Sequence, residues 1–123
     1  MENKIQNFTD LTAYRTAHSL VLKAYKITQH LPIEERFALG DQMRRSAISI
    51  TSNIAEGFSR NTGKDKSQFY AIAKGSATEL QSQALIAKDL AYITENEYKD
   101  LENEIVNTTR LVSGLIKSAR NHF

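Results

Sequence analysis

Apolar residues recur every three or four positions along most of this chain, which is the spacing of one face of an α-helix. The last quarter is the most regular, with core-type residues at Tyr98, Leu101, Ile105, Thr108, Val112, Leu115 and Ala119. Spacings that alternate between three and four are typical of the seam of a helical bundle. The breaks in the pattern predict four helices, over about residues 10–30, 34–57, 65–91 and 95–120.

The single proline of the chain separates the first two predicted helices. Pro32 ends the first one, because the residue before a proline is displaced from the α region. The apolar stripe of the first helix is Leu11, Tyr14, His18, Val21 and Tyr25, widened by Ala17, Ala24 and Ile27. The core stripe of the second is Met43, Ala47, Ile50 and Ile54. We expect Gly57 to end the second helix, since glycine favours helix C-termini.

The third predicted helix contains a glycine in its interior. A glycine there costs roughly 1 kcal/mol relative to alanine, so Gly75 predicts a close approach of two backbones. The apolar side of this helix holds Phe69, Ala73, Leu80, Ala84, Ala87 and Ala91, extended by Ile72 and Leu90. Thr94 and Glu97 have the spacing of a capping box, which predicts the start of the fourth helix.

Four helices joined by short turns predict one domain, residues 1–123, that folds as an up-down-up-down antiparallel four-helix bundle. The polar face of residues 41–57 is unusual, because it is rich in small uncharged side chains that compete with helical hydrogen bonds. We therefore expect it to lie against another helix or another subunit. The candidate contact residues are Ser46, Ser49, Asn53, Glu56, Gly75, Ser76 and Glu79.

Two glutamates of this group suggest a further hypothesis. Glu56 and Glu79 lie among small or apolar residues, and we expect one of them to anchor an ion pair with an arginine such as Arg44 or Arg45, inside the chain or between subunits. Alanine at an internal pair would cost well over roughly 1 kcal/mol, since it would leave a buried charge without its partner.

Composition and charge narrow the class of protein. Hydrophobic residues make up 41% and charged residues 24% of the chain, which is ordinary for a globular domain. The longest uncharged stretch, residues 46–55, is about half of the roughly 20 residues that a membrane span needs. No targeting segment and no cysteine are present, so we expect a cytoplasmic protein.

The net charge is only +2, but the middle of the chain holds most of the positive charge. A basic region is able to contact phosphates, and the alternative is a solvated surface of mixed charge. The candidate nucleic-acid-binding residues are Arg36, Arg44, Arg45, Arg60, Lys64, Lys66 and Lys74.

The sequence offers no recognisable catalytic, metal or cofactor site. The three histidines lack a second ligand at metal-binding spacing. The stretch from Gly57 to Asp65 departs from a P-loop, because five residues separate its glycines and Asp65 replaces the magnesium-binding Ser/Thr. The serines have no accompanying base, and the G-x-S-x-G pattern is absent. We therefore expect that the protein is not an enzyme.

Two motifs resemble a known family. The stretches QMRRSAISITSNIAEG at residues 42–57 and GSATEL at residues 75–80 are similar to the signature of the 23S rRNA-intervening sequence proteins, a four-helix bundle family. The opening residues 8–28 and the pair Leu31-Pro32 also match, and the resemblance covers about residues 8–115. Thr51 departs from it, since relatives usually carry proline there, and we expect a straighter second helix.

The resemblance implies a small antiparallel bundle that assembles into a homopentameric ring, with no established enzymatic activity and a largely unknown role. It also implies a distant similarity to the accessory variability determinant proteins of diversity-generating retroelements. Those proteins form basic pentameric barrels that bind a reverse transcriptase and nucleic acid.

Two functions from different classes remain open. The first is an oligomeric scaffold that binds RNA or DNA, in which five copies would raise a charge of +2 per chain to about +10. The second is a protein-interaction adaptor without direct nucleic-acid binding, similar to a reverse-transcriptase accessory protein. Neither function involves a membrane.

Overall fold

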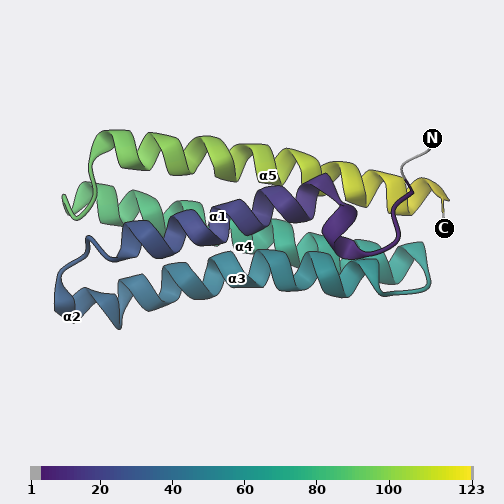
Figure 1. Cartoon of the computed structure of the whole chain (residues 1–123), viewed down its shortest axis with the longest axis horizontal. Helices are drawn as coiled ribbons and strands as arrows, with labels where there is room; N and C mark the ends of the chain where they lie inside the picture. Colours follow the sequence, from purple (N-terminus) through teal and green to yellow (C-terminus); the bar gives the residue numbers. More distant parts are fainter. Residues whose placement is uncertain (1–3, 123) are drawn as a thin grey trace.

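Four long helices run antiparallel to one another and form a bundle (Figure 1). The computed structural model describes residues 4–122, with side chains described for residues 4–121, and it contains no strand in this range. A short 3₁₀-helix, η1 (Phe8–Asp10), precedes α1 (Thr12–Thr28), and α2 (Ile33–Arg36) precedes α3 (Leu39–Phe58). The bundle is completed by α4 (Gly63–Asp89) and α5 (Glu95–His122). Within the described range no helix is both long and apolar enough to cross a membrane.

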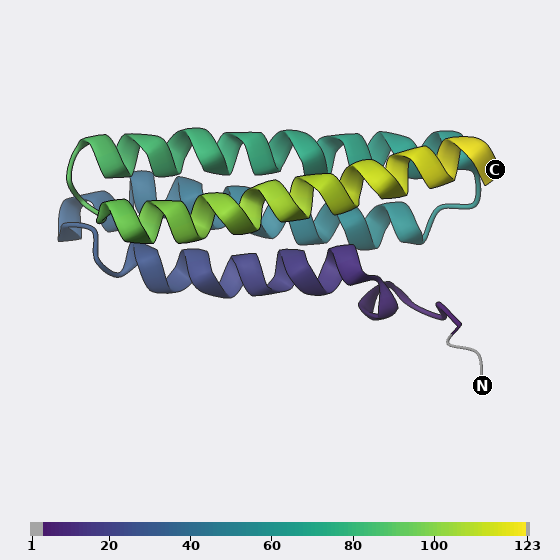
Figure 2. The same ribbon diagram turned by 90° about the horizontal axis from the view of Figure 1, so that it is seen from above.

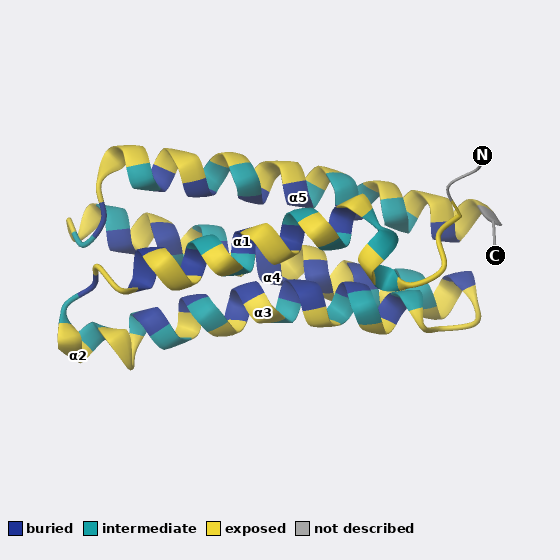
Figure 3. Cartoon of the chain, viewed as in Figure 1, coloured by how far each residue is buried: buried dark blue, intermediate teal, exposed yellow. Residues whose placement is uncertain are grey.

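Each long helix packs against two others, as the view from above also shows (Figure 2). The helix α3 contacts α1 and α4, and α5 contacts α1 and α4. Buried positions recur along every long helix (Figure 3). The predicted stripe of α3 is fully buried, and the α5 seam is buried except for the half-buried Leu115. Many of the most buried residues are alanines, which allow the helix axes to approach closely.

The buried stripe of α1 differs from the predicted one. The buried residues are Ala13, Ala17, Leu20, Ala24 and Ile27, whereas His18 and Tyr25 are exposed. The larger side chains of the predicted stripe lie at the margin of the buried stripe, because the small alanines face the neighbouring helices. A similar shift affects α4, where Ile72 and Leu90 are about half exposed.

The predicted second helix is two helices, α2 and α3, separated at Phe37 and Ala38. Ala38 has a non-helical backbone (φ −117°, ψ −94°), and the Phe37 side chain is 83% exposed. The chain folds back here so closely that a Cβ on Gly40 would lie 3.2 Å from the Glu35 carbonyl oxygen. No proline or glycine occupies the break itself, which explains why the sequence pattern does not mark it.

Gly57 does not end α3, which continues to Phe58. The residue is buried, and a Cβ placed on it would lie only 2.6 Å and 2.8 Å from two ring carbons of Tyr70 on α4. The close helix approach that the sequence predicts at Gly75 therefore occurs at Gly57 instead. Gly75 is exposed, and nothing lies within 4 Å of a Cβ placed there.

The turn between α4 and α5 has a well-defined geometry. The helix α4 ends at Asp89, two residues before the predicted end, and Ala91 adopts a left-handed backbone with φ 62°. The Tyr92 amide donates to the Ala87 carbonyl (2.9 Å), which is the long bond of a Schellman motif. The predicted capping box follows and is confirmed: the Glu97 amide donates to Thr94 Oγ1 (3.0 Å), and the Thr94 amide donates to Glu97 Oε1 (2.8 Å).

Candidate nucleic-acid interface

The seven predicted phosphate-binding residues lie at two opposite ends of the bundle. We call these the α2 end, which holds α2 and the α4–α5 turn, and the termini end, which holds both chain termini and the α3–α4 connection (Figure 1). Arg36, Arg44 and Arg45 lie toward the α2 end. The remaining four, which lie toward the termini end, are Arg60, Lys64, Lys66 and Lys74. The prediction from the sequence therefore grouped residues that do not lie on one surface of the folded protein.

At the α2 end, two arginines bind backbone and side-chain oxygens of their own chain. Arg36 donates through Nη2 to the Gln29 carbonyl (3.0 Å) and through Nε to the Leu31 carbonyl (3.3 Å). Arg44 donates to Thr28 Oγ1 (3.1 Å) and to the Arg36 carbonyl (2.7 Å). Arg36 satisfies carbonyl groups just beyond the C-terminus of α1, and Arg44 satisfies the carbonyl at the C-terminus of α2, which lack helical partners. Arg36 and Arg44 thus hold the helix ends together.

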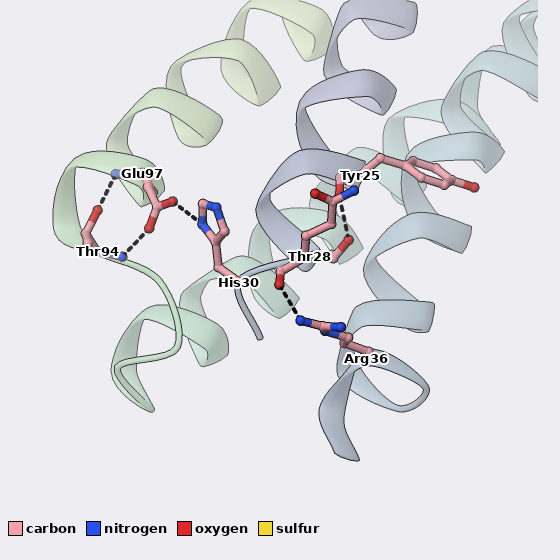
Figure 4. A network of polar contacts seen from close by, with 7 residues as sticks. Tyr25, Thr28, His30, Arg36, Thr94 and Glu97 are labelled. Carbon is pink, nitrogen blue, oxygen red and sulfur yellow. Dashed lines mark hydrogen bonds and ion pairs between the residues drawn. The ribbon is translucent and has the colours of Figure 1, made fainter. Parts of the chain in front are cut away.

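Acidic side chains complete the polar network at the α2 end. Figure 4 shows His30 turned toward Glu97, and His30 Nδ1 lies 2.6 Å from Glu97 Oε2. The bond from the Thr94 amide, with a further contribution from His30, lowers the pKa of Glu97. Arg45 pairs with Asp41 (2.8 Å). Charges at this end therefore largely compensate one another.

Lys23 is held against the acidic first half of α5. Its ammonium group lies 2.8 Å from Asp100 and 2.6 Å from Glu104. Hydrogen bonds to these two carboxylates raise the pKa of Lys23. This ion-pair cluster joins α1 to α5 and leaves no surplus positive charge there.

At the termini end, a groove between α4 and α5 is lined by three cations and, among the residues that the structure describes, by no Asp or Glu. We call it the basic groove, and its volume is about 270 Å³. Its lining residues are Lys74, Ser113, Ile116, Lys117, Arg120 and Asn121. The sequence prediction included Lys74 but missed Lys117 and Arg120. The signal that would have found them is the second half of α5, which holds Arg110, Lys117 and Arg120 without any Asp or Glu.

Charged residues over the whole chain are distributed in the same way, with the excess of positive charge toward the termini end. The segments that build the termini end, residues 4–18, 50–76 and 108–121, contain nine Lys and Arg against three Asp and Glu. The segments of the opposite half, residues 19–49 and 77–107, contain seven Lys and Arg against ten Asp and Glu. A net charge of +2 therefore conceals a positive and a negative half.

The other predicted cations of the termini end differ in their surroundings. Arg60 pairs with Glu56 (2.6 Å), and its guanidinium lies over the Phe69 ring at 4.6 Å. Lys66 donates to the Phe58 carbonyl (2.8 Å), and burial lowers the pKa of its ammonium group. Lys64 and Lys74 are exposed. Of the predicted set, only Lys74 lines the basic groove.

The small polar residues of α3 meet α4 directly. Ser49 Oγ and Ser76 Oγ lie 2.7 Å apart, and Asn53 donates to the Ser49 carbonyl (2.8 Å). Ser46 and Ser76 are buried. These side chains therefore form a polar contact between two helices of one bundle.

The hypothesis of an ion pair inside the chain between Glu56 or Glu79 and Arg44 or Arg45 is wrong, whereas such a pair between subunits stays a prediction. Glu56 is exposed and pairs with Arg60 one helical turn away, rather than with Arg44 or Arg45. Glu79 is exposed as well. Both carboxylates point away from the core because the opposite side of each helix carries the buried stripe. Among residues 4–122, no three His, Cys, Asp or Glu side chains are grouped in a way that would hold a metal ion.

Comparisons with known proteins agree with this architecture. A family model described as 23S rRNA-intervening sequence protein matches residues 9–114. A crystal structure from Bacteroides thetaiotaomicron, of a protein with unknown function from the S23 ribosomal protein family, superposes with a TM-score of 0.80. The two chains are 21% identical over 86% of this chain and 99% of that one, a likeness that shows the fold alone. No curated protein matches the chain.

Proposed function

This chain belongs to the 23S rRNA-intervening sequence protein family, and from that premise we propose that it is a non-enzymatic, homo-oligomeric bundle that binds the phosphates of RNA or DNA. The observation that carries the proposal is the basic groove, in which Lys74, Lys117 and Arg120 converge from two helices. The similar Bacteroides protein is itself described as having unknown function.

The groove has the chemistry that a phosphate backbone requires. Lys74, Lys117 and Arg120 supply positive charge, while Ser113 and Asn121 offer neutral hydrogen-bond donors. Within residues 4–121, no Asp or Glu side chain lines the groove to compete with a phosphate. The excess of cations over the whole termini end extends the attraction beyond the groove and would favour encounter with a polyanion.

Assembly would multiply this charge. Side chains such as Leu85, Ile86 and Leu90 on α4 are between 41% and 52% exposed, and a contact with another copy would remove their apolar surface from water. We propose a homopentamer, as the family resemblance implies. Rotational symmetry would then place all five termini ends on the same side of the ring, where their positive charges add. The cytoplasm is the proposed compartment.

A charge-reversal experiment tests the proposal. The triple variant Lys74→Glu, Lys117→Glu, Arg120→Glu is compared with Lys26→Glu, Arg45→Glu, Lys99→Glu, which makes the same change in charge toward the α2 end. Binding to fluorescein-labelled single-stranded RNA, single-stranded DNA and duplex DNA is measured by anisotropy at several salt concentrations. We expect the first variant to bind at least tenfold more weakly and to show a shallower salt dependence, since fewer counterions are released. Equal losses in both variants, or no binding by the native protein at low salt, would refute the proposal.

The exposed apolar residues also support the alternative, a protein-interaction adaptor that does not bind nucleic acid. Light scattering distinguishes the oligomer that the adaptor would form from a monomer, whose mass would be 13.9 kDa. A stable oligomer that fails to bind any of the three nucleic acids would favour the adaptor. A monomer that binds them through the basic groove would instead remove the homopentamer from the proposal.

A further inference from the structure

A second pocket at the termini end is lined by two neighbouring rings, which are tilted relative to one another, and an arginine. We call it the α1 pocket, and it has a volume of about 350 Å³ lined by Thr9, Tyr14, Arg15 and His18. Tyr14 and His18 lie one helical turn apart on α1, with ring centroids separated by 6.1 Å and ring planes inclined by 32°. Phe8 packs edge-on against Tyr14 at 4.7 Å, which fixes the tyrosine ring from behind.

These rings do not serve the core of the bundle. His18 is exposed and Tyr14 is half-buried, although the helical pattern predicts both on the apolar stripe. The buried positions around them are Ala13 and Ala17. A tyrosine and a histidine held side by side at the surface, with ring planes inclined by 32°, offer a partly apolar platform with polar edges.

Arg15 connects this platform to a second, polar groove. It lines both the α1 pocket and a groove of about 550 Å³ between α1 and α5, whose other lining residues include Asn107 and the carboxylates Asp100 and Glu104. Asn107 accepts a hydrogen bond from Arg110 (2.6 Å), on the same basic half of α5 that supplies Lys117 and Arg120. The two carboxylates pair with Lys23 at 2.8 Å and 2.6 Å, and Arg15 is a cation that this groove shares with the α1 pocket.

We propose that the α1 pocket binds an unpaired nucleobase of a single strand, which stacks on Tyr14 and His18 while Arg15 contacts the adjoining phosphate. The inference rests on the proposed nucleic-acid binding and adds a preference for single strands. Proteins that bind single strands combine a positive groove with aromatic side chains on which bases stack, without strong sequence preference. A paired base inside a duplex does not present its face to such a platform.

The test uses the full-length chain and a single-stranded DNA oligonucleotide that carries 2-aminopurine, whose fluorescence is quenched when it stacks on an aromatic ring. Tyr14→Leu and His18→Ala are compared with Tyr25→Leu, which removes an exposed tyrosine from the other end of the same helix. Tyr14→Phe keeps a stacking ring and controls for folding, because Tyr14 also packs against Phe8. Adenosine monophosphate tests whether a free nucleotide suffices.

We expect Tyr14→Leu and His18→Ala each to weaken single-strand binding by about fivefold or more and to reduce the quenching, as the energy of base stacking predicts. Duplex binding, Tyr25→Leu and Tyr14→Phe should stay within about twofold of the native protein. If the protein binds both strand types but these variants bind single strands normally, the stacking site is refuted while the basic groove stands. If assembly of the oligomer blocks the quenching, another subunit covers the pocket. If adenosine monophosphate binds as tightly as the strand, the preference for strands is refuted. Failure of the native protein to bind any nucleic acid would instead refute the proposed function itself.

Discussion

The two ends of the bundle carry similar numbers of cations but handle them in different ways. At the α2 end, Arg36 and Arg44 bind carbonyl groups, and Lys23 lies between two carboxylates. At the termini end, Lys74, Lys117 and Arg120 face a common groove that no Asp or Glu of the described part of the chain lines. The comparison teaches that a count of basic residues does not identify a binding surface. A cation attracts a ligand when its own chain has not already neutralised it.

The ends also differ in what stabilises them. The α2 end depends on hydrogen bonds that satisfy helix termini, whereas the termini end depends on close packing of α3 against α4 at Gly57 and Tyr70. A binding surface next to a rigid helix contact keeps its shape without additional polar bonds. Four substitutions test this difference, and each has a matched control.

The largest effect is expected from Arg44→Ala at the α2 end. The side chain is half-buried, and its loss would leave the Arg36 carbonyl and Thr28 Oγ1 without their donor. Unfolding in urea should show a loss of roughly 2–3 kcal/mol, as expected for bonds made to a charged group. Arg45→Ala, which removes only an exposed ion pair, should cost less than about 1 kcal/mol. Equal costs would show that the α2 end does not depend on this network.

At the termini end, Gly57→Ala should destabilise the bundle through packing alone. The added methyl group would overlap the ring of Tyr70, which is itself buried and unable to move aside. Thermal and urea unfolding should show a net loss of about 1–2 kcal/mol. The matched variant Gly75→Ala meets no neighbouring atom and should gain about 0.5–1 kcal/mol from its better helix propensity. The same sign for both variants would contradict the packing argument.

A smaller, favourable effect is expected from Ala91→Gly in the turn of the α2 end. Ala91 has a left-handed backbone, which costs a non-glycine residue roughly 1–2 kcal/mol. Glycine should therefore stabilise the protein by about 1 kcal/mol, less the entropy that it adds to the unfolded chain. Ala71→Gly, at an exposed position inside α4, should destabilise the protein by about 1 kcal/mol. Differential scanning calorimetry of the two variants measures both shifts.

The smallest effect is a dependence on pH at Glu97. Its pKa is lowered from 4.5, so its contribution to stability is present above that value and is lost as the pH falls through the folded-state pKa. Glutamine retains the capping contact but removes the ion pair with His30. Glu97→Gln should therefore cost less than about 1 kcal/mol at pH 7 and lose less stability than the native chain between pH 6 and pH 3. Glu79→Gln, an exposed control, should follow the native pH profile, and urea unfolding at each pH makes the comparison.

Much of the fold could be predicted from residue spacing. The α5 seam was correct because its large apolar side chains repeat over several turns, and the α3 stripe was correct for the same reason. The α1 stripe was misplaced because its buried side consists largely of alanines, which give a weak hydrophobic signal. The break at Ala38 was missed because no local turn residue marks it in the sequence. The contacts of Arg44 and Gly40 accompany the break instead, and they exist only in the folded chain.

The candidate site was less predictable than the fold. Lys74 and Lys117 lie 43 positions apart on consecutive helices, and only the antiparallel pairing of α4 and α5 brings them into one groove. Arg44 had the charge of a phosphate ligand, but its tertiary contacts assign it to capping. Charge is a property of the sequence, whereas the absence of a neighbouring carboxylate is a property of the fold.

The location of both termini at one end of the bundle has a practical consequence (Figure 2). An affinity tag or fluorescent label that follows α5 would lie close to Arg120 and Asn121 of the basic groove, and one that precedes η1 would lie close to Thr9 of the α1 pocket. A polyhistidine or acidic tag there would change the local charge and alter the binding that it is meant to report. The turn between α4 and α5 is a better attachment point, because the 15 residues of α4 that follow Lys74 place it roughly 20 Å beyond the nearest cation of the groove.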